Sequence, residues 1–438
     1  MKSILIPICA ALLLSGCGLF GGDGDATPTI GNRTPILVSE NDVQIDPQIA
    51  TVPVVLPPAT VNAGWVQPGG SASKSLGHLA LSNVPTQAWS QSIGDAGGSR
   101  ARLAAAPVVA NGRVFTIDTD ATVRAFDAQN GAEVWSTRFG SEIGSNSALF
   151  GGGVSVSGDR LYVTNGVGYA GALNVADGSQ IWKVRPGGPL RGAPTIANNN
   201  VYVLTQDNQV FALDPATGET RWNVSGTLEV SGVFGVAAPA SAQGTLVAGF
   251  SSGELIAYRY ENGQIVWQDG LNRTSISTSV STLSDIDASP VIDSGFVYAI
   301  GQGGRMVALR LITGERLWEV NAGGLSTPWI AGDWMFAVTD DARVLAIART
   351  NGRIRWISQL PRFRDEEDRK GPIFWRGPVL AGGQLILVST RGHLAFIDPA
   401  TGAVSRMEEL DEGVELPPIV ANNTLYLLDT DGELSAWR

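Results

Sequence analysis

Two aspartates separated by one residue, Asp285 and Asp287, are the carboxylates whose spacing is most suggestive of chemistry in this chain. Such a pair could contribute ligands to a Ca²⁺ site, cap a turn, or pair with basic groups on another protein. A Ca²⁺ site needs about six to eight oxygen ligands, so two carboxylates alone are weak evidence for one. The structural alternative is that one Asp caps a turn and the other is solvated. Residue types alone leave these interpretations open.

The histidines and cysteines exclude several kinds of catalytic site. His78 and His393 are far apart in the sequence, and there is no third histidine for a metal cluster. Cys9 and Cys17 both precede residue 20, so the rest of the chain has no thiol for a disulfide, a zinc or haem motif, or a nucleophile. A Ser/His/Asp triad through His393 is formally possible, but this residue follows Arg391-Gly392 in what reads as a solvated turn. We therefore predict no catalytic, metal-binding or cofactor-binding residues, and no enzyme activity.

The charge of the chain limits its partners. Its 438 residues carry a formal net charge of −11, and only 16% of them are charged. An acidic chain is repelled by nucleic acid and by anionic lipid headgroups, so neither is an expected partner.

A repeated phrase indicates the elements that position these residues. It is clearest from Leu213 to Trp222, where an apolar strand end enters a turn closed by Gly218 and a Trp follows four residues later. The glycine allows the positive φ of a tight strand reversal, and the Trp provides a large apolar surface for joining neighbouring units. The same Gly-to-Trp spacing occurs at Gly131 and Trp135, Gly178 and Trp182, Gly263 and Trp267, Gly314 and Trp318, and Gly352 and Trp356. Successive Trp residues of the phrase lie 38 to 51 residues apart, a spacing typical of four-stranded propeller blades.

The two ends of the repeat region complement each other. Residues 87–91 match the last strand of a repeat but have no strands before them, whereas 417–437 supply three strands and then the chain stops. Joining these pieces closes a ring and removes both sheet edges. We therefore predict an all-β fold over 85–438: an eight-bladed β-propeller of four-stranded antiparallel blades, closed by the N-terminal strand.

The first 84 residues read as three segments. Residues 1–16 have a Lys followed by a short apolar run, which is typical of an export signal. Leu14-Ser15-Gly16-Cys17 resembles the lipobox of bacterial lipoproteins, which implies cleavage before Cys17 and lipidation of its side chain. Residues 17–60 are rich in Gly, Asp, Pro and Thr and are expected to form a disordered tether. Residues 61–84 form a lead-in segment, in which Trp65 and His78 are expected to pack on the surface.

The joins between blades are equivalent segments, so they emerge on one rim of the predicted ring. Their charged residues are Arg100, Arg102, Arg191, Asp285, Asp287 and Arg376. A rim of mixed charge suits protein recognition, because charges at an interface steer the partner while apolar neighbours anchor it.

The eight predicted blades resemble the quinoprotein-type propeller, a superfamily that includes dehydrogenases dependent on PQQ. Those enzymes use a vicinal Cys pair and long insertions around the quinone, whereas this chain lacks the pair and has mostly short joins. These differences make a periplasmic quinoprotein dehydrogenase, or a ligand-binding propeller, the alternative interpretation and not the main one.

The lipobox, the blades and the stretch Leu-Ser-Asp-Ile-Asp-x-Ser-Pro at 283–290 together resemble the BamB family of outer-membrane β-barrel assembly lipoproteins. This resemblance implies a non-catalytic scaffold, anchored by its lipid on the periplasmic face of the outer membrane, that works with other Bam subunits. It assigns Asp285 and Asp287 to contact with the POTRA domains of a BamA-like partner. The family's second contact motif, Leu-x-Leu-Arg-Gly, aligns with Leu228, Val230 and Gly232 but lacks its Arg here; Arg191 stands in a similar stretch one blade earlier.

Overall fold

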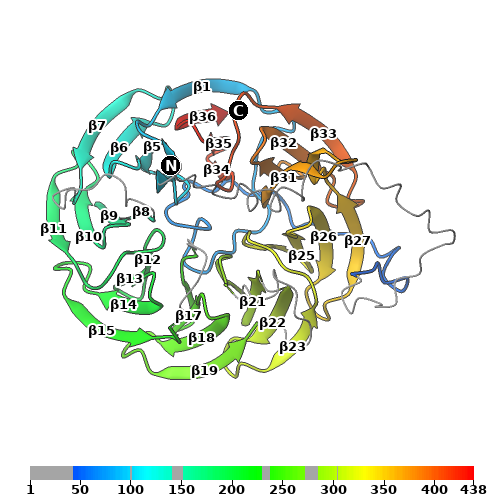
Figure 1. Ribbon diagram of the computed structural model, residues 1–438, viewed down its shortest axis with the longest axis horizontal. Coiled ribbons are helices and arrows are strands. Elements are labelled where there is room, and N and C mark those ends of the chain that lie inside the picture. Colours follow the sequence, from blue (N-terminus) through cyan, green and yellow to red (C-terminus); the bar gives the residue numbers. More distant parts are fainter. Residues whose placement is uncertain (1–42, 99–100, 141–150, 229–236, 272–284, 303) are drawn as a thin grey trace, which may run out of the picture. The chain divides into compact units, whose positions relative to one another are not determined.

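The computed structural model describes residues 43–98, 101–140, 151–228, 237–271, 285–302 and 304–438, all within one compact unit that spans residues 41–438. These residues form eight four-stranded antiparallel sheets and two short hairpins. The sheets are arranged as the blades of a ring (Figure 1). The predicted all-β, eight-bladed propeller is therefore confirmed. No helix among the described residues is long and apolar enough to cross a membrane.

Each blade runs from an inner strand to an outer strand in chain order. Blades 1 to 4 consist of β4 (Val108–Ala110), β5 (Arg113–Ile117), β6 (Thr122–Asp127) and β7 (Glu133–Arg138); β8 (Gly152–Ser157), β9 (Arg160–Asn165), β10 (Ala170–Asn174) and β11 (Gln180–Val184); β12 (Thr195–Ala197), β13 (Asn200–Leu204), β14 (Gln209–Leu213) and β15 (Thr220–Ser225); and β16 (Ala240–Ala242), β17 (Thr245–Gly249), β18 (Glu254–Arg259) and β19 (Ile265–Gly270). The second and third strands are buried almost throughout, because neighbouring blades cover both of their faces.

Blades 5 to 8 repeat the plan, with one exception at the end of the chain. They consist of β20 (Val291–Asp293), β21 (Phe296–Gly301), β22 (Arg305–Arg310) and β23 (Arg316–Val320); β24 (Trp329–Ala331), β25 (Trp334–Val338), β26 (Arg343–Ala348) and β27 (Ile354–Gln359); β30 (Trp375–Ala381), β31 (Gln384–Ser389), β32 (His393–Ile397) and β33 (Val404–Glu409); and β34 (Ile419–Ala421), β35 (Thr424–Leu428), β36 (Glu433–Trp437) and β1 (Gln87–Ser92). The exception is that the outer strand of blade 8, β1, comes from the N-terminal side and pairs antiparallel with β36, as predicted.

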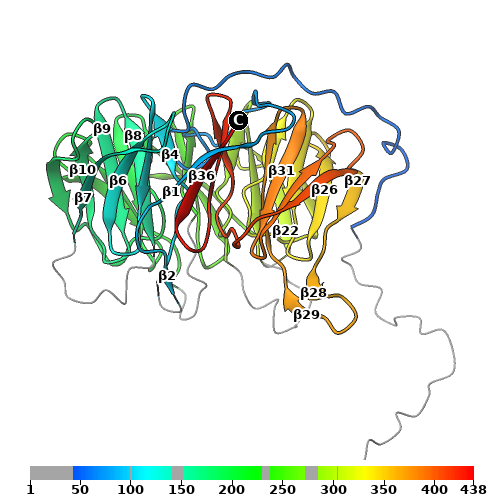
Figure 2. The same ribbon diagram turned by 90° about the horizontal axis from the view of Figure 1, so that it is seen from above.

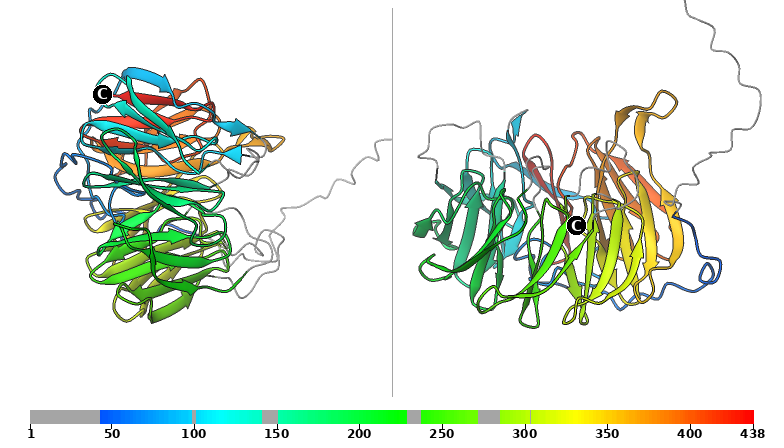
Figure 3. Two further views of the ribbon diagram at one scale, coloured as in Figure 1. Left: turned by 90° about the vertical axis from the view of Figure 1, so that its left-hand side faces the viewer. Right: turned by 60° about the horizontal axis from the view of Figure 1, so that its bottom comes forward.

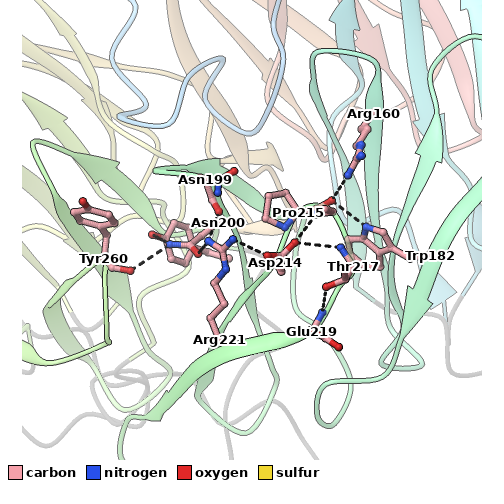
Figure 4. A network of polar contacts seen from close by, with 12 residues as sticks. Arg160, Trp182, Asn199, Asn200, Asp214, Pro215, Thr217, Glu219, Arg221 and Tyr260 are labelled. Atoms are coloured by element: carbon pink, nitrogen blue, oxygen red, sulfur yellow. Dashed lines mark hydrogen bonds and ion pairs between the residues drawn. The ribbon is translucent and has the colours of Figure 1, made fainter.

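At seven of the eight boundaries, the Gly-to-Trp phrase joins one blade to the next through a specific contact, shown for blades 2 and 3 in Figure 4; blade 7 has Arg406 in place of the Trp. The indole Nε1 of Trp182 donates to the carbonyl of Pro215 in the next blade's turn at 3.0 Å. In that turn, the Asp214 carboxylate accepts from the backbone N–H of Ala216 at 2.7 Å and forms an ion pair with Arg221 at 2.6 Å. The turn is therefore fixed from within and also receives the Trp of the preceding blade.

The turn glycine is required by space as well as by its φ of +78° at Gly218. A Cβ added to Gly218 would lie 2.5 Å from Cε3 of Trp182, so the indole packs directly on the glycine. Other glycines of the phrase meet the Trp of the preceding repeat in the same way: Gly131 with Trp89, Gly178 with Trp135, Gly263 with Trp222, Gly314 with Trp267, Gly352 with Trp318, and Gly402 with Trp356. The repeat spacing seen in the sequence is thus the spacing of these contacts between blades.

We expect Gly218→Ala to lower the free energy of unfolding by roughly 2–4 kcal/mol, because strain at positive φ adds to displacement of a packed indole. Urea denaturation followed by Trp fluorescence measures the change. Gly295→Ala is the matched control, since Gly295 has a φ of +81° but no atom within 4 Å of the added Cβ. A loss no larger than that of the control would show that indole packing contributes nothing at this turn.

The lead-in segment has a larger role than the sequence predicts. Trp65 is only 4% exposed and stacks on Trp329 with ring centroids 6.1 Å apart, so its expected place on the surface is wrong. The segment makes polar contacts with all eight blades: Trp65 with Val109, Val66 with Val156, Gln67 with Ile196, Ala72 with Ser241, Ser73 with Ile292, Gly77 with Trp329, Leu79 with Leu380, and Asn62 with Val420. It therefore binds the inner strands of the ring together.

Residues 43–60 also differ from expectation, because the sequence assigns them to the disordered tether. The backbone N–H of Asp46 donates to Ile354 of β27 at 2.8 Å, and Arg355 Nε donates to the carbonyl of Val52 at 2.7 Å. These residues therefore lie along the outer strand of blade 6 before the chain enters the lead-in segment.

The two faces of the ring are different. The blue segment that contains the lead-in residues crosses one face, while β2 (Gly97–Gly98) points toward the other (Figure 2). The hairpin of β28 (Phe363–Asp365) and β29 (Lys370–Pro372) also projects on the side away from the lead-in segment (Figure 3). The joins between blades lie on this hairpin face, so it carries the candidate site.

Candidate functional site

The Asp-Ile-Asp join between β19 and β20 is held rigidly by its own backbone. The N–H of Ile286 donates to Phe250 O at 3.1 Å, and Asp285 O accepts from Gln302 N at 2.9 Å. The Ile286 side chain is fully buried against Gly249, where the absence of a Cβ makes room for it. The apolar residue between the two aspartates is thus an anchor that fixes both carboxylates.

Arg191 comes to this join from the one between β11 and β12. Its backbone N–H donates to Leu204 O at 2.8 Å, and its carbonyl accepts from Gly152 N at 3.0 Å. The guanidinium Nη2 lies 3.3 Å from Asp287 Oδ1, so two joins that are 96 residues apart in sequence meet in an ion pair. We call Arg191, Asp285 and Asp287 the buried ion cluster.

The burial of this cluster corrects the sequence analysis. Arg191 is 0% exposed, Asp285 is 1% exposed and Asp287 is 9% exposed, so these side chains do not stand on an open rim. Arg102 is exposed and Arg376 is half-buried. Only part of the predicted mixed-charge rim is therefore accessible. We therefore expect replacement of either aspartate to disturb the fold, because buried charges depend on one another.

Burial also changes how the cluster titrates. It raises the pKa of Asp287 to about 6, although the positive charges of Arg191 and Arg376 oppose this rise. The pKa of Arg191 is lowered, chiefly by burial and against the attraction of Asp287 and Asp285. Both shifts show that loss of hydration outweighs the mutual attraction of the charges. Burying these charges therefore costs free energy, and the fold bears this cost at the joins between blades.

A cavity of about 310 Å³ occupies the centre of the ring next to the cluster. Trp65, Gly69 and Lys74 of the lead-in segment line one end, and Arg102, Arg376 and Glu415 of the joins line the other. Because the lead-in segment crosses the face opposite the joins, the cavity is a cup whose floor is that segment. We call it the central cup; Asp287 lies on its wall.

The remaining candidates for catalysis form a turn rather than a triad. Ser389 is fully buried, and its Oγ lies 2.9 Å from His393 Nδ1. The same Oγ accepts from the backbone N–H groups of Arg391 and His393 at 3.2 and 3.0 Å, so it caps the turn and is not placed to attack a substrate. In the described parts of the chain, no three His, Cys, Asp or Glu residues gather as a metal site would require.

Comparison with known proteins identifies the family. The model of the family described as outer membrane protein assembly factor BamB matches residues 85–149 and 119–358. The assembly factor BamB of Shigella dysenteriae is 30% identical, over 99% of this chain and 98% of that protein. The chain belongs to the BamB family. The Escherichia coli member is 29% identical over the same shares of the two chains.

Solved structures agree on the fold. BamB from Moraxella catarrhalis superposes with a TM-score of 0.69 at 20% identity, covering 81% of this chain and all of that one. The quinohemoprotein alcohol dehydrogenase of Comamonas testosteroni also matches, with a TM-score of 0.66 at 14% identity, covering 86% of this chain and 81% of that chain. At this identity the second likeness shows a shared propeller only. The chain is thus a member of a family of assembly factors, and the prediction that it is not an enzyme agrees with that family.

The BamB-family contact residues predicted from the sequence are found in different situations. Leu228 is 68% exposed and follows β15 on the hairpin face. Val230, Arg100 and Cys17 lie outside the described residues. The structure joins Arg191 to the Asp-Ile-Asp motif, as described above. Lys74, which is 2% exposed, could not be recognised as a buried residue from the sequence, because it stands in a Gly- and Ser-rich stretch.

Proposed function

We propose that this chain is a non-catalytic scaffold in the assembly of outer-membrane proteins and that it docks on the POTRA domains of a BamA-like protein. The observation that carries this proposal is the match to BamB assembly factors across nearly the whole chain, with the propeller intact. The names of these relatives place the family at the outer membrane. A rigid ring without a metal or catalytic cluster in its described parts suits a protein that binds and orients others.

The proposed docking region is the hairpin face around Leu228 and the buried ion cluster, with Val230 as a further member. In this arrangement Leu228 is an apolar anchor, since a large apolar side chain that is mostly exposed gains free energy when a partner covers it. Arg191, Asp285 and Asp287 would then act mainly by fixing the shape of the neighbouring joins and by setting the local field. Any direct contact would be made through Asp287, the most exposed of the three.

We expect Leu228→Asp to weaken binding to the POTRA fragment at least about tenfold, because an apolar anchor is replaced by a charge that must be desolvated. The free energy of unfolding should change by no more than about 0.5 kcal/mol, as for other surface substitutions. Isothermal titration with a purified BamA-like POTRA fragment measures the affinity. A detergent pull-down of the lipidated protein, with partners identified by mass spectrometry, tests the same contact in the membrane.

Ile312→Asp is the matched control for this experiment. Ile312 is 61% exposed and lies in the turn between β22 and β23, on the face opposite the joins. The Ile312→Asp variant should bind the POTRA fragment with the affinity of the wild type. Wild-type binding by Leu228→Asp, or an equal loss in both variants, would contradict docking through this face.

The proposed anchor is a lipid on Cys17. We expect Cys17→Ala to abolish palmitate labelling and to leave the protein as an uncleaved or released precursor, because the lipobox resemblance requires the thiol for lipid attachment. Metabolic labelling with radioactive palmitate and fractionation of membranes provide the measurement. Cys9→Ala, which changes the other cysteine, should be labelled normally; undiminished label in Cys17→Ala would place the anchor elsewhere.

A further inference from the structure

The floor of the central cup holds a lysine that the scaffold role does not use. Lys74 lines the cup and is 2% exposed. Its Nζ donates one hydrogen bond, to Thr195 Oγ1 at 3.1 Å, although an ammonium group has three N–H donors. In the described part of the chain, Lys74 has no carboxylate within ion-pair distance and no charged group that offsets its burial.

Burial without a counter-charge is costly for an ammonium group. Loss of hydration is the cause that lowers the pKa of Lys74 to about 7. Buried lysines are ordinarily paired with an acidic group or replaced by an apolar residue. Near neutral pH this side chain is therefore ready to accept an anion that would restore the lost solvation of its charged form.

The position of Lys74 is fixed by the fold rather than by chance. Ala72 accepts a hydrogen bond from Ser241 N of blade 4, and Ser73 accepts one from Ile292 N of blade 5, both at 2.8 Å. Lys74 itself has a φ of +65°, and its stem packs against Gly69 so closely that a Cβ there would lie 2.8 Å from Lys74 Cδ. The backbone is thus held in a conformation that non-glycine residues rarely adopt, with the side chain turned into the cup lining.

The rest of the cup is apolar below a charged mouth. Trp65 and Trp329 stack at the floor, and Val108, Val379 and Ile419 line the wall. At the mouth, Glu415 lies 3.8 Å from Arg102, and Arg376 Nε donates to the backbone carbonyl of Glu415 at 2.9 Å. A cavity of about 310 Å³ with apolar walls and a few polar groups matches the small end of the range for small-molecule sites.

The cup charges also favour an anion. Of the two lining carboxylates, Asp287 pairs with Arg191 and Glu415 pairs with Arg102. Among the residues that the structure describes, Lys74 has no carboxylate partner at the floor, inside a chain whose net charge is −11. An anion that enters the cup therefore meets a positive group in a dry environment, where a charge-assisted hydrogen bond is strongest.

We propose that the central cup is a binding site for a small carboxylic acid with an apolar body, whose carboxylate accepts a hydrogen bond from Lys74. The apolar body lies against the Trp65 and Trp329 end of the cup. Thr195 positions the ammonium group but does not bind the ligand, because its own hydroxyl donates to Pro239 O at 2.6 Å. The Lys74 end of this site shares no residue with the proposed POTRA contact, which adjoins the cup only at Asp287 on its wall.

The test compares 2-naphthoate with its neutral counterpart 2-naphthamide by isothermal titration on the wild-type full chain. The acid should bind at least about tenfold more tightly than the amide, because only the acid pairs with the ammonium group. In Lys74→Met the two affinities should become equal. Lys370→Met, which removes an exposed lysine on the β28–β29 hairpin, should keep the wild-type preference.

Equal affinities in the wild type, no measurable binding of the acid, or an undiminished acid preference in Lys74→Met would each overturn the proposal. Leu103→Trp provides a second test of location, because it narrows the cup without changing Lys74. It should weaken both ligands together. If Lys74→Met does not fold, the acid-to-amide ratio of the wild type and the loss in Leu103→Trp still decide the outcome: an unchanged affinity in Leu103→Trp would place the ligand outside the cup.

Discussion

Replacing Arg191 with methionine should lower the free energy of unfolding by about 3–5 kcal/mol at pH 7, and by clearly less at pH 5. Methionine keeps most of the volume of the side chain but removes the cation that faces Asp287 at 3.3 Å and attracts Asp285 as well. Asp287 is buried, so its carboxylate would lose the stronger of the two cations that lower its pKa, Arg191 and Arg376, in a poorly hydrated site. Breaking a buried ion pair from one side typically costs this much, because the remaining charge keeps its desolvation penalty.

The sign of the pH dependence follows from Asp287. Burial raises its folded-state pKa to about 6, above the 3.8 of the unfolded chain, so its ionisation lowers stability progressively from about pH 3.8 to about pH 6, and the full penalty is present above about pH 6. Removing Arg191 takes away an attraction that lowers this pKa, so the penalty at pH 7 becomes larger in the variant. At pH 5 the carboxylate is mostly protonated in the folded state, so the penalty is reduced and depends little on the presence of Arg191.

Urea denaturation of wild type and Arg191→Met at pH 5 and pH 7 provides the measurement. Arg138→Met is the matched control: Arg138 is an exposed residue at the end of β7, and its loss should change the free energy of unfolding by at most about 0.5 kcal/mol at either pH. A deficit in Arg191→Met that is equal at both pH values would show that shape, and not charge, explains the role of this residue.

The ring could be predicted from the sequence because its signals are local. Gly218 and the Trp four residues later belong to one hairpin, and the contact with Trp182 recurs at seven of the eight boundaries between blades, each time between the turn Gly of one repeat and the Trp of the preceding repeat. Ring closure could also be predicted, since residues 87–91 and 417–437 each lack what the other supplies. Periodic local contacts leave a pattern that can be read without the structure.

The site could be predicted only in part because its contacts are not local. The motif at Asp285 and Asp287 was visible, but nothing near it indicates that Arg191 arrives from a join 96 residues away and buries the charges. The lead-in segment contacts each blade through different residues, so it has no period of its own. Trp65 was therefore expected on the surface, and Lys74 was not singled out. Predicting their burial requires the three-dimensional path of residues 61–84 across the ring.

Lys74 contradicts the local rule that charged residues stay in water, and natural proteins usually break such rules where function requires it. If the fold carries this cost for a ligand, removing the charge should make the protein without ligand more stable. Lys74 is thus both the residue on which carboxylate binding depends and a residue that opposes folding. The two effects can be measured on the same variant.

We expect Lys74→Met to raise the free energy of unfolding by roughly 3–5 kcal/mol at pH 7, because a drop in pKa from 10.5 to about 7 corresponds to that range of differential free energy. The folded state disfavours the ammonium form, so the penalty is fully present below about pH 7 and disappears as the pH rises toward 10.5. The gain in the free energy of unfolding from methionine should therefore shrink at pH 10.

Urea denaturation at pH 7 and pH 10 measures this gain. Lys370→Met is the control, because loss of its exposed lysine should not change the free energy of unfolding at pH 7. A variant less stable than the wild type at pH 7 would mean that the hydrogen bond to Thr195 outweighs the cost of burial, and that Lys74 serves the fold itself.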